Sequence, residues 1–217
     1  MNLTGDFSIS TWVNFATLSG TKDILSSFTL LGGNYYGFEL YANGPGLKFS
    51  TFNGTTTYLL NDLLSGGDPL SANTWYNIVI TRKSSTGTKM YINGTLNVSN
   101  TSTQNPVYAP TNYATIGASN AGSYVNLAAS GTKIDGLTIW NKELTVSEIV
   151  SLYNAGNGAE YPFSSQTLPT PNDSFGTNHG TLMNGTTFTT GKIGKAFTFD
   201  GAVSYTHLRA HETGRNL

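Results

Sequence analysis

Cysteine is absent from the 217 residues of this chain. Its absence excludes a disulfide framework, a thiolate zinc site and a thiol nucleophile, and it leaves the redox compartment undetermined. Charge is also scarce, because Asp, Glu, Lys and Arg make up 11% of the residues, against roughly 25% in typical soluble domains. We therefore expect a polar but nearly uncharged surface of Ser, Thr, Asn and Gly.

The chain also has no long basic or apolar run. Eleven Lys and Arg against twelve Asp and Glu give a formal net charge of −1, and the longest basic run is Arg82-Lys83. This excludes a nucleic-acid footprint. No window approaches the roughly 20 apolar residues of a membrane span, and the opening MNLTGDFSIS shows neither the basic nor the apolar region of a signal peptide.

What is present points to short strands. Apolar and polar residues alternate from Phe7 to Phe15, which is the period-2 pattern of a half-buried strand. Strand character recurs in residues 35–42, 46–52, 75–82, 89–93, 113–116 and 133–140. Turns rich in Gly and Asn separate these segments and supply the positive φ angles of tight hairpins. Many short strands at regular spacing predict an antiparallel sandwich.

One segment predicts a helix. Thr145 is placed as N-cap with Glu148 as its capping-box partner, and Leu144 and Ile149 are spaced as a hydrophobic staple. Residues 154–156, Asn-Ala-Gly, supply the stop. We expect the helix to dock through an apolar stripe that consists of Val146, Ile149, Val150 and Tyr153.

A family resemblance rests on four segments: FSISTWVNF (7–15), TWYNIVITR (74–82), KMYING (89–94) and IDGLTIWNKELTVSEIVSLYNAG (134–156). Together they resemble the laminin-G-like (LamG) repeats of the concanavalin A-like lectin/glucanase superfamily. The resemblance implies an all-β, antiparallel two-sheet jelly-roll sandwich with one short α-helix after the last strand. Such repeats are common in bacterial surface proteins and phage structural proteins, which implies an extracellular, cell-surface or virion location.

The resemblance also suggests how the chain is divided. Residues 1–161 look like a LamG-like sandwich that lacks its first strands, residues 162–171 a linker, and residues 172–202 the opening strands of a next repeat. We expect residues 172–202 to fold back and fill the empty sheet position, and a dangling tail is the alternative. Residues 203–217 resemble the translated sequencing-adapter tails of metagenomic reading frames. We predict no regular element there and exclude His207 and His211 from function.

No catalytic residue is predicted. Glycosidases on this scaffold work through two carboxylates, and in the laminarinase-like branch these alternate on one strand. Here Glu39 stands alone, Glu143 and Glu148 belong to the start of the helix, and His179 lies in a Gly/Asn turn. We therefore predict that the protein is not an enzyme.

Binding of a sugar is the stronger hypothesis, because aromatic faces stack on pyranose rings and amides bond their hydroxyl groups. The candidate ligand-binding residues are Asn34, Tyr35, Tyr36, Tyr41, Asn43, Tyr58 and Asn61. The alternative is that these Tyr residues only pack in the sheet. Trp12, Trp75 and Trp140 are predicted to be core residues.

A structural Ca²⁺ ion is the one cofactor that the resemblance suggests. Asp135 in IDG and Asp200 in FDG are the candidate metal ligands. Calcium takes six to eight oxygen ligands, so two acids are few, and the alternative is that both are turn or cap residues.

These observations predict a non-catalytic carbohydrate-binding or adhesion module of a multi-repeat surface or virion protein. Its expected partners are a glycan or polysaccharide, another surface protein, and neighbouring repeats of the same chain. The alternative is a structural spacer or self-association repeat without a ligand of its own.

Overall fold

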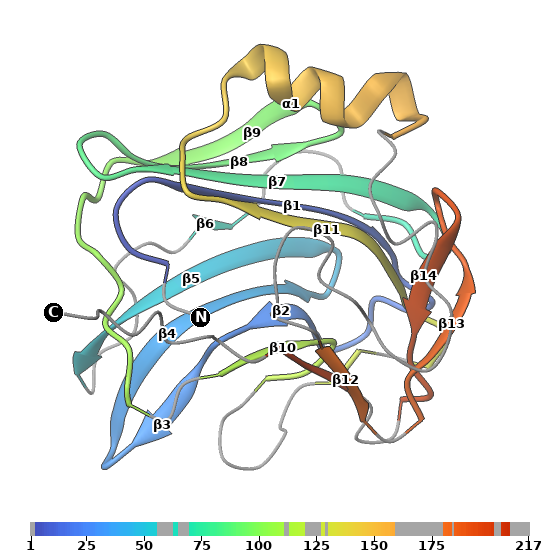
Figure 1. Cartoon of the computed structure of the whole chain (residues 1–217), viewed down its shortest axis with the longest axis horizontal. Coiled ribbons are helices and arrows are strands. Elements are labelled where there is room, and N and C mark those ends of the chain that lie inside the picture. Colours follow the sequence, from blue (N-terminus) through green and yellow to red (C-terminus); the bar gives the residue numbers. More distant parts are fainter. Residues whose placement is uncertain are drawn as a thin grey trace, which may run out of the picture.

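Two antiparallel sheets, A and B, lie face to face, and one α-helix lies on the outer face of sheet A (Figure 1). A computed structural model of the chain describes residues 3–55, 63–64, 70–110, 113–119, 127–128, 130–158, 180–183, 185–201 and 205–208. The predicted two-sheet sandwich with a single short helix is confirmed for this part of the chain.

Sheet A carries the helix. Its strand order is β13 (Thr187–Thr190), β14 (Lys195–Thr198), β11 (Lys133–Trp140), β1 (Phe7–Asn14), β7 (Trp75–Lys83), β8 (Gly87–Ile92) and β9 (Thr95–Asn100). Sheet B has the order β12 (Gly180–Met183), β15 (Tyr205–Leu208), β10 (Ala114–Ile116), β2 (Thr21–Ser26), β4 (Asn34–Asn43), β5 (Gly46–Thr55) and β6 (Leu63–Leu64), and β3 (Thr29–Leu31) pairs with β4.

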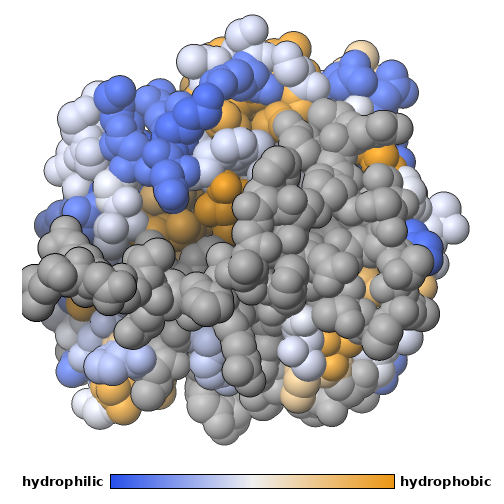
Figure 2. Space-filling model, in the orientation of Figure 1, coloured by the Kyte–Doolittle hydropathy of each residue, from blue (hydrophilic) through white to orange (hydrophobic). Residues whose placement is uncertain are grey.

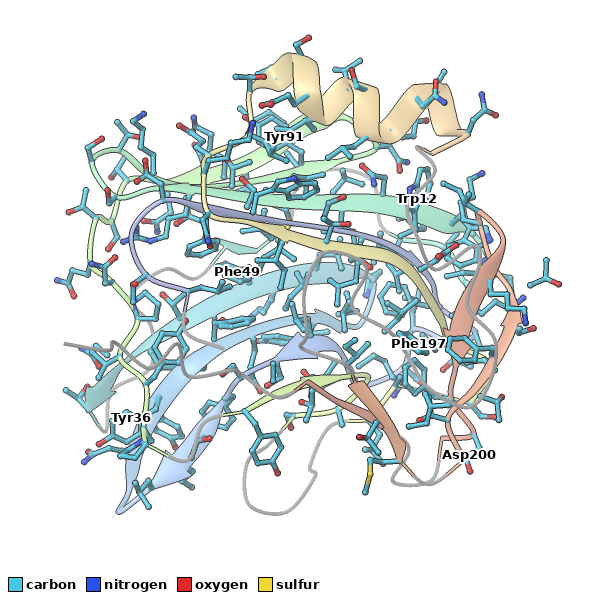
Figure 3. The ribbon with its side chains drawn as sticks, viewed as in Figure 1. Trp12, Tyr36, Phe49, Tyr91, Phe197 and Asp200 are labelled. Carbon is cyan, nitrogen blue, oxygen red and sulfur yellow. The ribbon has the colours of Figure 1, made fainter. Side chains whose placement is uncertain are left out.

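The core fills the space between the sheets. Alternate residues of the central strands face inward, because successive side chains of a strand point to opposite faces. The Phe7 and Phe49 rings meet edge to face across the two sheets, with centroids 6.4 Å apart, and Figure 3 shows Phe49 between the sheets. Buried side chains of this kind each stabilise the fold by roughly 1.5–3 kcal/mol.

Strand β1 is buried on both faces. All eight of its residues are buried, although apolar and polar residues alternate along it. Ile9 and Val13 lie in the core. On the other face, the Ser8 hydroxyl donates to the Lys142 carbonyl (2.8 Å) and accepts from the Leu144 amide (2.9 Å). The chain that leads into the helix therefore covers the outer face of β1.

Helix α1 (Val146–Tyr153) begins as the sequence predicts. The Thr145 side chain accepts from the Glu148 amide, and the Glu148 side chain accepts from the Thr145 amide (2.8 Å), which completes the capping box. Asn154, at φ 45°, ends the helix in the left-handed conformation. Among the described residues, no helix has both the length and the apolar character needed to cross a bilayer.

The predicted docking stripe is wrong for two of its members. Val146 and Val150 are 60% and 51% exposed, and Figure 2 shows hydrophobic surface among the polar residues at the top of the view, where α1 lies. The helix docks instead through Ile149 and Leu152, which are buried in a cluster with Leu144, Val79 and Tyr91. The Leu144–Ile149 staple fixes which side of α1 faces the sheet, and this turns both Val side chains outward.

Tryptophan side chains contribute to the packing between α1 and sheet A. Trp12 is buried, but under α1 rather than between the sheets, because its ring stacks on Tyr153 with centroids 6.0 Å apart. Trp140 is half-buried and packs against the same helix cluster. Trp75 is half-buried at the start of β7.

Residues 185–201 return to the sandwich and extend sheet A. β14 pairs with β11, with Phe197 opposite Ile134, and β13 pairs with β14. Phe197 and Phe199 lie in the main core. Gly117 has a φ of +81°, and a Cβ there would lie 2.4 Å from the Phe199 ring, so Phe199 packs where only glycine fits. That these strands open a further repeat stays a prediction.

The prediction of no regular element in residues 203–217 is wrong for residues 205–208. β15 lies in sheet B between β10 and β12, with His207 opposite Thr115 on one side and opposite Thr181 on the other. Backbone groups of a strand edge need partners, and backbone pairing requires no particular side-chain pattern. The adapter-like origin of residues 203–217 stays a prediction.

Candidate functional site

The predicted glycan platform is spread along β4. Asn34 and Asn43 are the end residues of this strand, which corresponds to a separation of roughly 30 Å. The structure therefore separates Asn34, Tyr35 and Tyr36 from Tyr41 and Asn43. Because successive residues of a strand alternate in direction, Tyr35 points to the outer face of sheet B, and Asn34 and Tyr36 point to the opposite face. The remaining two candidates, Tyr58 and Asn61, lie outside the described residues.

The Asn34 end of β4 holds a group of aromatic rings. The Tyr35 ring stacks on Phe28, with centroids 5.6 Å apart and planes at 17°, and Phe52 completes the cluster at 4.8 Å from Phe28. The Tyr36 ring lies against Gly54, where a Cβ would be 3.0 Å from it, and Figure 3 shows Tyr36 at the β3–β4 end of sheet B. These contacts hold the Tyr rings in place.

Asp135 organises a turn. Its Oδ1 accepts from the Gly136 amide (2.7 Å) and its Oδ2 from the Ile193 amide (2.9 Å). Burial raises the pKa of Asp135, and hydrogen bonds from the backbone amides of Ile193, Gly136 and Lys192 act in the opposite direction. The carboxylate thereby fixes the β13–β14 turn against β11.

Asp135 and Asp200 do not fit a shared calcium site. Ile134 stands opposite Phe197, so Asp135 lies beside Ala196, roughly 13 Å along the ladder from Asp200. Calcium ligands lie about 2.3–2.6 Å from the ion. Figure 3 shows Asp200 at the far end of the β13–β14 hairpin. Calcium binding by either acid alone stays a prediction.

A pair of acids on sheet B was missed by the sequence interpretation. Phe38, Leu40 and Ala42 of β4 lie in the core, so Glu39 and Tyr41 point to the outer face of the sheet. Asp23 of β2 stands opposite Tyr41. Asp23 and Glu39 are therefore diagonal neighbours on one face, and the prediction that Glu39 stands alone is wrong.

Both acids are buried, with Asp23 1% exposed and Glu39 9% exposed. Burial raises the pKa of Asp23 well above its usual value, the Glu39 carboxylate raises it further, and the nearby Ser119 hydroxyl lowers it. Burial raises the pKa of Glu39 to about 7. At these exposures neither acid can flank a sugar in the way that a glycosidase requires.

Residues that carry hydroxyl groups flank this pair. Ser26 and Ser50 stand opposite Glu39 on the two neighbouring strands, and Thr115 stands opposite Ser26. The Ser26 hydroxyl accepts from the Phe28 amide (3.1 Å), and Thr115 donates to the Ala118 carbonyl (2.5 Å). These hydroxyl groups are thus engaged with the backbone.

The raised pKa of Glu39 predicts a pH dependence of stability. A carboxyl whose folded pKa is raised binds its proton more tightly in the folded state, so its contribution is present below the unfolded pKa of 4.5 and is lost as pH rises through about 7. In metal-free buffer, the wild type should lose about 3 kcal/mol relative to Glu39→Gln across this window. Urea denaturation of both proteins at a series of pH values measures the difference. Parallel profiles would contradict the assignment.

A polar hollow of about 430 Å³ lies at the N-terminal end of α1. Its charged lining consists of Asp6, Lys83, Lys89, Lys142 and Glu143. The Lys89 Nζ lies 2.9 Å from Oε1 of Glu143, and the Lys83 Nζ lies 3.9 Å from Oε2. Glu143 thus pairs with a Lys of β7 and a Lys of β8, and these pairs tie the segment before α1 to both strands.

Comparison with known proteins gives a family and a set of similar folds. A family model described as the concanavalin A-like lectin/glucanases superfamily matches residues 1–150. A comparison with curated proteins gives no match.

Similar solved structures are binding domains of botulinum neurotoxins. The binding domain of serotype G has a TM-score of 0.52 and 16% identity over 72% of this chain and 37% of that chain. The serotype D ligand binding domain in complex with N-acetylneuraminic acid has a TM-score of 0.54 and 17% identity over 72% of this chain and 38% of that chain. The serotype DC binding domain in complex with SialylT has a TM-score of 0.53 and 19% identity over 70% of this chain and 35% of that chain. The chain spans little more than a third of these domains, and the identities establish similarity of fold alone.

Proposed function

Because the chain belongs to the concanavalin A-like lectin/glucanases superfamily, we propose that it is a non-catalytic carbohydrate-binding module that contacts glycan at the β3–β4 end of sheet B. The observation that carries the proposal is the Tyr35 ring, which is held on Phe28 and Phe52 at the outer face of sheet B. A pre-positioned aromatic ring suits a pyranose ring, because little side-chain entropy is then lost on binding. The solved complexes with sialic acid and SialylT concern toxin domains and suggest acidic glycans as first probes.

The test is a glycan array and a polysaccharide pull-down with the full chain. We expect Tyr35→Ala to weaken binding about tenfold, which corresponds to the loss of one stacking contact, and Tyr36→Ala and Asn34→Ala, on the opposite face of β4, to weaken it less. Tyr41→Ala and Asn43→Ala change residues of the same types at the other end of β4 and serve as matched controls. If only these control substitutions weaken binding, the protein binds glycan as proposed, but its site lies at the Asn43 end of β4.

A wild-type protein that retains no glycan would favour the alternative of a structural spacer or self-association repeat. Its mass in solution would then show whether the chain associates with itself. The multi-repeat parent and the surface or virion location are further parts of this proposal.

A further inference from the structure

We propose that Asp23 and Glu39 hold a hard divalent cation, with Ca²⁺ the best fit, on the outer face of sheet B. This site lies in the middle of sheet B and is distinct from Asp135 in β11 and Asp200 after β14, which belong to sheet A. It is independent of glycan binding, because the β3–β4 end of the sheet supplies none of its carboxylates.

The β2–β4 register places the two carboxylates together. Asp23 stands opposite Tyr41, and Glu39 lies two residues before Tyr41 on the same face of β4. Diagonal neighbours of this kind have Cα atoms roughly 7–8 Å apart, within reach of long side chains. The register shift between Asp23 and Leu25 lets Asp23 point outward while Ile24 and Leu25 are both buried in the core.

Asp23 is the buried charge that the fold leaves unsatisfied. Neither of its carboxylate oxygens lies within hydrogen-bonding geometry of a partner, and the Ser119 hydroxyl, whose proximity lowers the pKa of Asp23, is the one polar group beside it that opposes the effect of burial. No Lys or Arg of the described residues forms an ion pair with Asp23 or Glu39. An unpaired carboxylate in such surroundings costs several kcal/mol, and a second one next to it adds repulsion.

Asp135 shows how the same fold satisfies another buried acid. It is as buried as Asp23, but both of its oxygens accept backbone amides. Nothing equivalent reaches Asp23, so a positive charge is the missing partner. Carboxylate and hydroxyl oxygens are hard ligands that suit Ca²⁺, and the remaining ligand positions would be filled by carbonyl oxygens and water.

The test uses Tb³⁺, a luminescent substitute for Ca²⁺, with the full chain after treatment with chelator. Tyr41 lies opposite Asp23, so excitation of tyrosine should sensitise Tb³⁺ emission, and Ca²⁺ should displace the ion. Asp23→Asn and Glu39→Gln should weaken binding about tenfold or more. Both variants remove a buried negative charge and are expected to fold. Glu143→Gln removes an acid of the α1 hollow and is the matched control, and Asp135→Asn tests the acid of β11 in sheet A.

A second measurement keeps the proposal falsifiable. Millimolar Ca²⁺ should raise the Tm of the wild type and of Glu143→Gln, and leave the Tm of Asp23→Asn unchanged. The proposal is overturned if the wild type gives no sensitised emission, or if Ca²⁺ shifts the Tm of the wild type and Asp23→Asn equally. It is also overturned if acidification alone stabilises the wild type and Ca²⁺ adds nothing, because the acids then share a proton instead.

Discussion

Replacing Ile149 with Asp is expected to undock α1 and to lower the free energy of unfolding by about 4 kcal/mol. Ile149 is fully buried in a cluster with Leu144, Leu152, Val79 and Tyr91. A carboxylate at this position would have apolar neighbours and no cation, so either it remains unpaired or the helix leaves the sheet. The second route exposes the outer face of β1, which α1 and the segment before it cover.

The neighbouring residue supplies the control. Val150→Asp places the same charge one position further on the same helix, where the side chain is exposed, and should change stability by no more than about 0.5 kcal/mol. Urea denaturation gives the free energies, and hydrogen exchange shows whether amides of α1 lose protection. Equal effects of the two substitutions would contradict the observed orientation of the helix. A larger loss of stability for Val150→Asp would support the docking stripe that the sequence predicts.

Local patterns in the sequence predicted local structure well. The bounds of β11 agree with the predicted residues 133–140, and the capping box at Thr145 forms as expected. Both depend on residues within one short segment, so the sequence contains all the information that they need. The orientation of α1 on sheet A depends instead on contacts with the distant strands β7 and β8. The sequence interpretation therefore placed Val146 and Val150 on the wrong side of the helix.

The pair of Asp23 and Glu39 shows more clearly what cannot be predicted from the sequence. β2 (Thr21–Ser26) was not predicted, because the strand is short and Ile24 and Leu25 are its only apolar residues. Once β2 is missed, nothing in the sequence brings Asp23 near Glu39, since their proximity depends on the register between two strands and on one irregularity in it. A search for alternating acids on one strand cannot find a pair built across two.

The same reasoning explains the divided glycan platform. Asn34 and Asn43 both flank Gly-containing turns in the sequence, which suggested one set of loops. A strand of ten residues separates its two ends by most of the width of the sandwich. At the β3–β4 end only Tyr35 of the three candidates points to the outer face, and its aromatic cluster could not be found from β4 alone, because Phe28 and Phe52 come from the segments on either side of that strand.

Arg82 is expected to give the other large effect. It is fully buried, and its guanidinium donates through Nη1 to the Gly5 carbonyl (3.0 Å) and through Nη2 to those of Thr103 (2.8 Å) and Gln104 (2.6 Å). These bonds join the segment before β1 to the segment after β9. Arg82→Met keeps an apolar side chain of similar length but leaves three carbonyl groups without a donor, and should cost about 3–5 kcal/mol.

Lys83→Met is the matched control, because it removes the next cation of β7, whose contact with Glu143 is a long surface ion pair worth at most about 1 kcal/mol. Urea denaturation measures both variants, and hydrogen exchange should rise first in residues 3–6 and 101–105 of Arg82→Met. Loss of protection there, with the central strands unchanged, identifies the guanidinium as the tie between the two segments. If Arg82→Met is as stable as the wild type, the cost of burying the charge equals the gain from its hydrogen bonds, and the two segments are held by their apolar contacts instead.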